Sequence, residues 1–132
     1  MNGSNTSPFD ITPKLLLVFQ NSNIGWNVGR IISRYGCIVE VANNGPEALK
    51  MLSWNFPYDL LITEMFIDEV SGFSLAEIAT GTPDTRTIAI NNGGEETRII
   101  AVETGADSVL DSPVEIDLLL DTAAMLLRDQ AI

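Results

Sequence analysis

Short apolar runs alternate with longer amphipathic segments along most of the chain. The apolar runs are rich in leucine and β-branched residues, which is typical of strands that are buried on both faces of a sheet. We predict such strands at residues 14–19, 37–41, 59–64, 86–91 and 108–111. Because each run is separated from the next by a segment of helical length, the pattern predicts parallel strands joined by crossover helices.

The segments after the strands carry the 3.6-residue repeat of apolar positions that marks a helix with one buried face. Asn44 and Pro46 predict the cap and the first turn of the second helix. Shorter helices are predicted at residues 74–80 and 94–104, each ended by a glycine. The predicted buried stripes are Ile24, Val28, Ile31, Ile32 and Tyr35 in the first helix, Ala48, Leu49 and Leu52 in the second, and Ile116, Leu119, Leu120, Ala123 and Leu127 in the last.

This order of elements predicts a flavodoxin-like, doubly wound α/β fold of five βα units. Its five-stranded parallel sheet should have the strand order 2-1-3-4-5, with helices on both faces. At 132 residues and 45% apolar content, the chain suits one compact domain. We expect this domain at residues 14–132, after a flexible polar tail at residues 1–13.

Composition narrows the classes of function. The formal net charge of −11, with only 7 Lys and Arg, disfavours nucleic acid and anionic membranes as partners. The chain has no His, the commonest general base and metal ligand at neutral pH, so any chemistry would have to come from carboxylates or hydroxyls. We expect neither an enzyme nor a bound cofactor or metal. The single Cys37 lies in an apolar run, and the polar N-terminal segment lacks a signal-peptide pattern, so we expect a cytoplasmic protein.

The predicted fold also indicates where a functional site should lie. In an open doubly wound sheet, ligands bind beyond the carboxyl ends of the strands. This rule selects Phe19 and Gln20 after the first strand, Glu64 at the end of the third, Asn91 and Asn92 after the fourth, and Asp111 and Ser112 after the fifth.

Several motifs stand at or beside these strand ends. They are "NNGPEALKML" at the start of the second helix, "YDLLITEM" over the third strand, "SG" at residues 71–72, and "GADSVLDSP" over the fifth strand. In this framework the chain resembles the receiver domain of two-component response regulators, from about residue 14 to residue 128.

The resemblance implies a phosphorylation pocket at these strand ends. Receivers take a phosphoryl group on an aspartate that ends the third strand, and that aspartate and an acidic pair after the first strand hold Mg²⁺. A hydroxyl residue after the fourth strand and a lysine after the fifth contact the phosphoryl oxygens. Position by position, the acidic pair falls on Phe19 and Gln20, the phosphoacceptor on Glu64, the hydroxyl on Asn91, the lysine on Ser112, and the switch aromatic of the fifth strand on Val109. None of them is the family's residue.

These replacements remove the metal carboxylates and the cationic lysine together, and phosphoryl transfer depends on positioning and charge neutralisation. We therefore expect a phosphorylation-independent pseudo-receiver that signals through protein–protein interaction in a two-component-type pathway. Two alternatives stay open: a receiver phosphorylated at an atypical carboxylate, Glu64 or Asp68, and a small-ligand sensor that uses the vacated pocket. Glu64 itself is open to interpretation as an inert relic or as a mimic of a phosphorylated aspartate.

The pocket should still be polar. The side-chain amides of Gln20 and Asn91 and the hydroxyl of Ser112 can donate hydrogen bonds. We expect all three to converge on the Glu64 carboxylate, which such donors favour in its ionised form.

The last two predicted helices carry more apolar residues than burial requires. Helical geometry turns Leu118 and Met125 to the side opposite the buried stripe, and it leaves Ile99 and Val102 pointing outward. The inward face of the preceding helix is expected to hold Thr97, Ile100, Ala101 and Thr104. The four outward residues are expected to form one patch beside the last strand, where the resemblance implies a homodimer or a docked signalling protein. The alternative is scattered exposure without a function.

Overall fold

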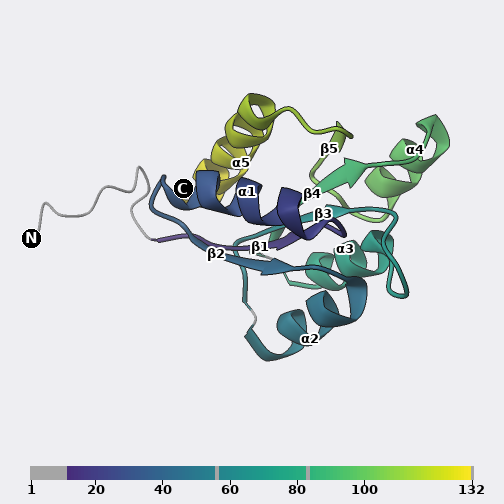
Figure 1. Ribbon diagram of the computed structural model, residues 1–132, viewed down its shortest axis with the longest axis horizontal. Helices are drawn as coiled ribbons and strands as arrows, with labels where there is room; N and C mark the ends of the chain where they lie inside the picture. The colour runs from purple at the N-terminus through teal and green to yellow at the C-terminus, as the bar shows by residue number, and fades with distance from the viewer. Residues whose placement is uncertain (1–11, 56, 83, 132) are drawn as a thin grey trace, which may run out of the picture.

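Each strand is followed by a helix in the computed structural model, which describes residues 12–55, 57–82 and 84–131 (Figure 1). The predicted tail lies outside the described residues up to residue 11. Backbone pairing already includes Pro13, whose carbonyl accepts a hydrogen bond from the Ile38 N–H. In chain order the elements are β1 (Lys14–Val18), α1 (Ser22–Ser33), β2 (Ile38–Ala42), α2 (Gly45–Asn55), β3 (Leu60–Glu64), α3 (Gly72–Thr80), β4 (Arg86–Asn91), α4 (Glu95–Glu103), β5 (Ser108–Asp111) and α5 (Ile116–Ala131).

The described strands form a five-stranded parallel sheet in the order β2-β1-β3-β4-β5, which confirms the predicted topology. Helices α1 and α5 cover one face of the sheet, and α2 and α3 cover the other (Figure 1). Side chains alternate along β1 because successive residues of a strand point to opposite faces. Leu15 and Leu17 pack under α1 and α5, whereas Leu16 and Val18 pack under α2 and α3.

The buried face of α1 differs from the predicted stripe. Ile24 and Tyr35 are exposed, and the buried residues of the helix are Gly25, Val28, Gly29 and Ile32. A Cβ added at Gly25 would lie 3.0 Å from the Val41 side chain, and one at Gly29 would lie 3.2 Å from it. The two glycines therefore let α1 lie close to the sheet, and this turns Ile24 outward.

Two further residues that were predicted to face inward are exposed, Leu49 on α2 and Ile100 on α4. Each has a small, fully buried alanine beside it in sequence, Ala48 and Ala101 respectively. Because only a narrow stripe of each helix meets the core, the larger neighbour is left at the surface.

The start of α2 agrees with the predicted cap. The side-chain oxygen of Asn44 accepts a hydrogen bond from the Glu47 N–H (2.8 Å), and the Glu47 carboxylate accepts one from the Asn43 N–H (2.8 Å). These bonds satisfy backbone donors that have no partner within the helix. No helix in the described ranges is long and apolar enough to cross a membrane.

Candidate functional site

The carboxyl ends of four strands meet at one edge of the parallel sheet. The register pairs Glu64 of β3 with Ile90 of β4, and Asn91 of β4 with Asp111 of β5. Gln20 follows β1, which lies next to β3. The structure therefore brings the strand-end residues selected from the sequence to one region, and their hydrogen bonds decide what that region can do.

Glu64 is held by the backbone of the neighbouring strand end. Its Oε1 accepts a hydrogen bond from the backbone N–H of Gln20 (2.8 Å). The Gln20 side chain is used elsewhere, because its Nε2 donates to Asp68 Oδ2 (3.2 Å) and its Oε1 accepts from the Asp68 N–H (2.8 Å). The prediction that the Gln20 amide donates to Glu64 was wrong, since that side chain is long enough to bridge to the loop after β3 instead.

Asn91 is buried and also turns away from Glu64. Its Nδ2 donates to the Gly94 carbonyl (3.1 Å) and to Asp111 Oδ1 (3.3 Å), and its Oδ1 accepts from Thr97 Oγ1 (2.6 Å) and the Gly93 N–H (3.2 Å). Two donors and two acceptor positions exhaust what a carboxamide can offer. Asn91 therefore secures the loop between β4 and α4, and the prediction that it serves Glu64 was wrong.

Asp111 is joined to α4 by an ion pair. Arg98 Nη2 lies 2.6 Å from Asp111 Oδ2, and Arg98 Nη1 donates to the Val109 carbonyl (3.4 Å). The hydrogen bond from Arg98 is the main cause that lowers the pKa of Asp111, and the Asn91 amide lowers it further. Sequence reasoning did not identify Arg98 and Thr97 as site residues. Their only sequence signal is that they lie about one turn into the helix predicted after Asn91.

The remaining positions of the predicted pocket show no hydrogen bond to Glu64. The backbone N–H of Ser112 donates to the Asn91 carbonyl (3.0 Å), and within the described chain no hydrogen bond joins the Ser112 hydroxyl to Glu64. Val109, at the switch-aromatic position, is half-buried and packs against the buried cluster of Met65, Ala89 and Ala101. The expected set of side-chain donors around Glu64 is thus replaced by a single backbone donor.

Phe19 is part of the hydrophobic core. Its side chain is 1% exposed and packs in the cluster formed under α1 and α5. A ring in that place offers no ligand to a cation. Asn92, the other residue selected after β4, bridges two loops instead: its Oδ1 accepts from the Phe66 N–H (2.9 Å) and its Nδ2 donates to the Phe66 carbonyl (3.0 Å).

A tight backbone contact sets the end of β3. The Gly72 N–H donates to the Met65 carbonyl (2.9 Å), and a Cβ added at Gly72 would lie 2.0 Å from the Glu64 carbonyl oxygen. Ser71 caps α3 by accepting a hydrogen bond from the Ser74 N–H (3.3 Å). Glycine is therefore required where α3 begins, because only a residue without a Cβ can approach the strand end so closely.

The site does not suit the Mg²⁺ ion that the resemblance implies. Mg²⁺ requires octahedral oxygen ligands, with carboxylates among them. Here the acidic pair is replaced by a buried ring and a neutral amide, and the Glu64 and Asp68 carboxylates already accept hydrogen bonds from Gln20. Among the residues described, no group of three or more Asp, Glu, Cys or His side chains could hold a metal ion.

Comparisons with known proteins agree with this geometry in its framework. Residues 16–124 match the family model of the response regulator receiver domain. The receiver domain of the Francisella response regulator 1452 is 24% identical, with a TM-score of 0.80, over 89% of this chain and 98% of that one. A CheY-like receiver domain protein from Methanospirillum hungatei JF-1 is 22% identical, with a TM-score of 0.83, over 91% and 97% of the two chains.

A receiver domain protein from Clostridium thermocellum is 24% identical, with a TM-score of 0.80, over 89% of this chain and 96% of that one. These structures share the fold of the chain. No curated protein matches it. The match to the family model extends from β1 into α5. It covers all five strands in full except for Lys14 and Leu15 at the start of β1. The chain therefore belongs to the response regulator receiver domain family.

Proposed function

We propose that this receiver domain of a two-component response regulator works without phosphorylation, as a pseudo-receiver that signals by binding a protein partner. The observation that carries the proposal is the burial of Phe19 at the position of the first metal carboxylate. A receiver that depends on Mg²⁺ needs an oxygen ligand at this position, and a buried aromatic ring provides none. The proposal keeps the cytoplasmic location and the single domain at residues 14–132 that we expect from the sequence.

The charges around Glu64 support the same conclusion. A phosphoryl group carries negative charge that must be neutralised during transfer. The lysine position holds Ser112, and Arg98, which lies beside the end of β5, is already paired with Asp111. The amides of Gln20 and Asn91 are also engaged, so the alternative of a small-ligand sensor in this pocket gains no support.

A phosphorylation assay tests the proposal directly. The protein is incubated with acetyl phosphate and Mg²⁺ and then weighed by intact mass spectrometry, and a parallel sample receives beryllofluoride for NMR. We expect no added phosphoryl group and no shift of the amide resonances at the strand ends. A mass increase that disappears in Glu64→Gln or in Asp68→Asn would contradict the proposal and identify the atypical acceptor.

We place the partner surface on α4 and α5, which lie on either side of β5 (Figure 1). Ile99 and Val102 on α4 and Leu118 and Met125 on α5 are each between 49% and 57% exposed. Burying such side chains against a partner stabilises a complex, since each removes apolar area from water. A homodimer or a second signalling protein would use this face.

Lysines introduced at exposed apolar positions distinguish a partner surface on this face from scattered exposure without a function. Light scattering and pull-down from the native host compare the wild type with an Ile99→Lys, Leu118→Lys variant. A matched control, Leu49→Lys with Ile78→Lys, places the same charges on exposed apolar residues of α2 and α3. We expect assembly or partner capture to fail only in the first variant. Equal behaviour of the two folded variants would rule out the α4 and α5 face.

A further inference from the structure

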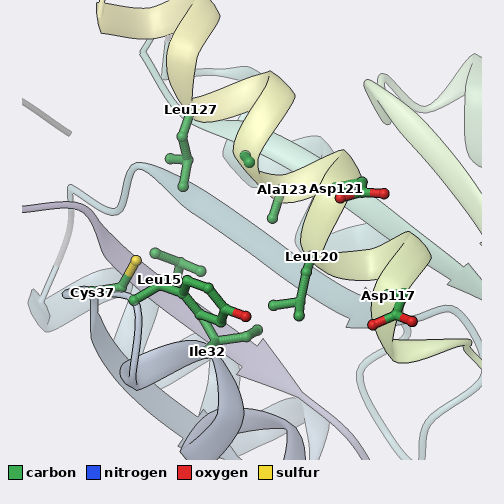
Figure 2. Close-up of a pocket in the computed structure, with 10 residues that line it drawn as sticks. Leu15, Ile32, Cys37, Asp117, Leu120, Asp121, Ala123 and Leu127 are labelled. Carbon is green, nitrogen blue, oxygen red and sulfur yellow. The ribbon is translucent and has the colours of Figure 1, made fainter. Parts of the chain in front are cut away.

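A cavity of about 430 Å³ lies between α1 and α5 (Figure 2). Its volume falls within the range of pockets that bind small molecules, roughly 300–1,000 Å³. The walls are mostly apolar, and none of the strand-end residues described above contributes to them. The apolar lining residues are Leu15, Ile32, Leu120, Ala123, Ala124 and Leu127.

Small side chains on α5 keep this space open. Ala123 and Ala124 line the cavity side of the helix between the larger Leu120 and Leu127. A leucine at either alanine would occupy part of the volume. The cavity therefore depends on small residues on α5, and one alanine-to-leucine substitution would reduce its volume.

The cavity has a polar end and an apolar end. Figure 2 shows Asp117 and Asp121 on α5 at the end opposite to Cys37 and Leu127. The two aspartates are four residues apart, so they lie one above the other on the same side of the helix. Both are exposed, and none of the ion pairs formed within the described ranges involves either one.

The cysteine end is uncharged. Burial raises the pKa of the Cys37 thiol, and the negative charge of Asp59 raises it further. A neutral thiol is a soft apolar contact and a poor nucleophile. Cys37 therefore suits the apolar part of a bound molecule, and no covalent step is implied.

We propose that this cavity binds a small amphipathic amine, with its apolar body between α1 and α5 and its ammonium group beside Asp117 and Asp121. The two carboxylates attract a cation and repel an anion, and the net charge of −11 acts in the same direction. The site shares no residue with the partner surface, although both lie on α5, and it does not depend on the proposed function.

Three probes with the same alkyl chain test the charge requirement: octylammonium, octanoate and 1-octanol. Cys37 is the single cysteine of the chain. The rate at which it reacts with a thiol reagent whose product absorbs light therefore reports whether the cavity is occupied. We expect octylammonium to slow the labelling of Cys37 and to shift amide resonances of α5. Octanoate should do neither, and 1-octanol should bind more weakly than octylammonium.

Variants locate the binding. An Asp117→Asn, Asp121→Asn variant should raise the octylammonium Kd about tenfold, since each exposed ion pair contributes modestly and both are lost together. Its control is Glu96→Gln with Glu103→Gln, which removes the same charge from α4 and should leave the Kd unchanged. Ala124→Leu occupies part of the cavity and should weaken both octylammonium binding and the protection of Cys37.

Several results would overturn the proposal: no octylammonium binding, octanoate binding as tightly as octylammonium, or a Kd that the aspartate variant does not change. Protection of Cys37 that is as strong in a folded Ala124→Leu protein as in the wild type would do the same. If Ala124→Leu does not fold, the aspartate variant and its control still decide, because exposed Asp to Asn changes leave the core intact.

Discussion

Replacing Phe19 with aspartate would restore a metal ligand of the family at a position that this protein uses for packing. Phe19 is 1% exposed, so Phe19→Ala should lower the free energy of unfolding by about 3–5 kcal/mol, through lost contacts and the cavity left behind. Phe19→Asp should cost more than alanine at neutral pH, because its carboxylate also loses hydration.

The pH dependence has a definite sign. Burial raises the pKa of the new carboxyl above its unfolded value, so between the two values the folded state binds more protons than the unfolded state. The free energy of unfolding of Phe19→Asp should therefore fall, relative to Phe19→Ala, as the pH rises from about 4 to 7.

Urea denaturation, monitored by circular dichroism, measures these differences in the free energy of unfolding. The control is Phe66→Ala, which removes a ring that is 49% exposed and should cost about 1 kcal/mol or less. A cost below about 1 kcal/mol for Phe19→Asp would refute the reasoning, because it would mean that the ring is not packed as the structure shows. Recovery of stability on adding Mg²⁺ would refute it too, since it would show a working metal site.

Three further predictions test the strand ends. Gly72→Ala should lower the free energy of unfolding by roughly 1–3 kcal/mol in urea denaturation, because its Cβ would lie 2.0 Å from the Glu64 carbonyl oxygen; an unchanged value would contradict that contact. NMR titration of Asp111 should give a pKa below the ordinary 3.8, and Arg98→Ala should raise it. Because this pKa is lowered by folding, the stabilisation is present above the ordinary value and is lost as the pH falls through the folded-state pKa, so wild type and Asp111→Asn should converge in acid; a constant difference would contradict the ion pair. Thr97→Val should cost about 1 kcal/mol and speed amide exchange in the loop after β4, and unchanged exchange would exclude its hydroxyl as a restraint there.

Local patterns predicted the elements closely. The strands begin and end within one residue of the predicted runs, because an apolar run of strand length is a property of neighbouring residues. The buried face of α1 was predicted less well. Gly25 and Gly29 carry no hydrophobic signal, yet they lie on the face that meets the sheet, whereas the apolar pattern predicts Ile24 and Tyr35 there.

At the strand ends, the sequence predicted which residue types come together but not their hydrogen-bond partners. The sequence shows that Gln20 and Asn91 bring amides to one edge of the sheet. Which partner each amide bonds to depends on which donors and acceptors lie within hydrogen-bond distance in the fold. Gln20 meets Asp68, which is 48 residues away, and Asn91 meets Thr97 and Asp111. Glu64 accepts its hydrogen bond from the backbone N–H of Gln20, and a backbone donor of this kind cannot be predicted from a pattern of side chains.

The sequence by itself determined the parallel fold and the loss of the family's charged residues, because strand periodicity and residue identity are both local properties. Only the tertiary structure decided that Phe19 lies in the core, which donor holds Glu64, and that α1 and α5 leave a cavity between them. The reason is physical: these features depend on distances of a few ångströms between segments far apart in the chain. Such distances are set by the packing of the whole domain.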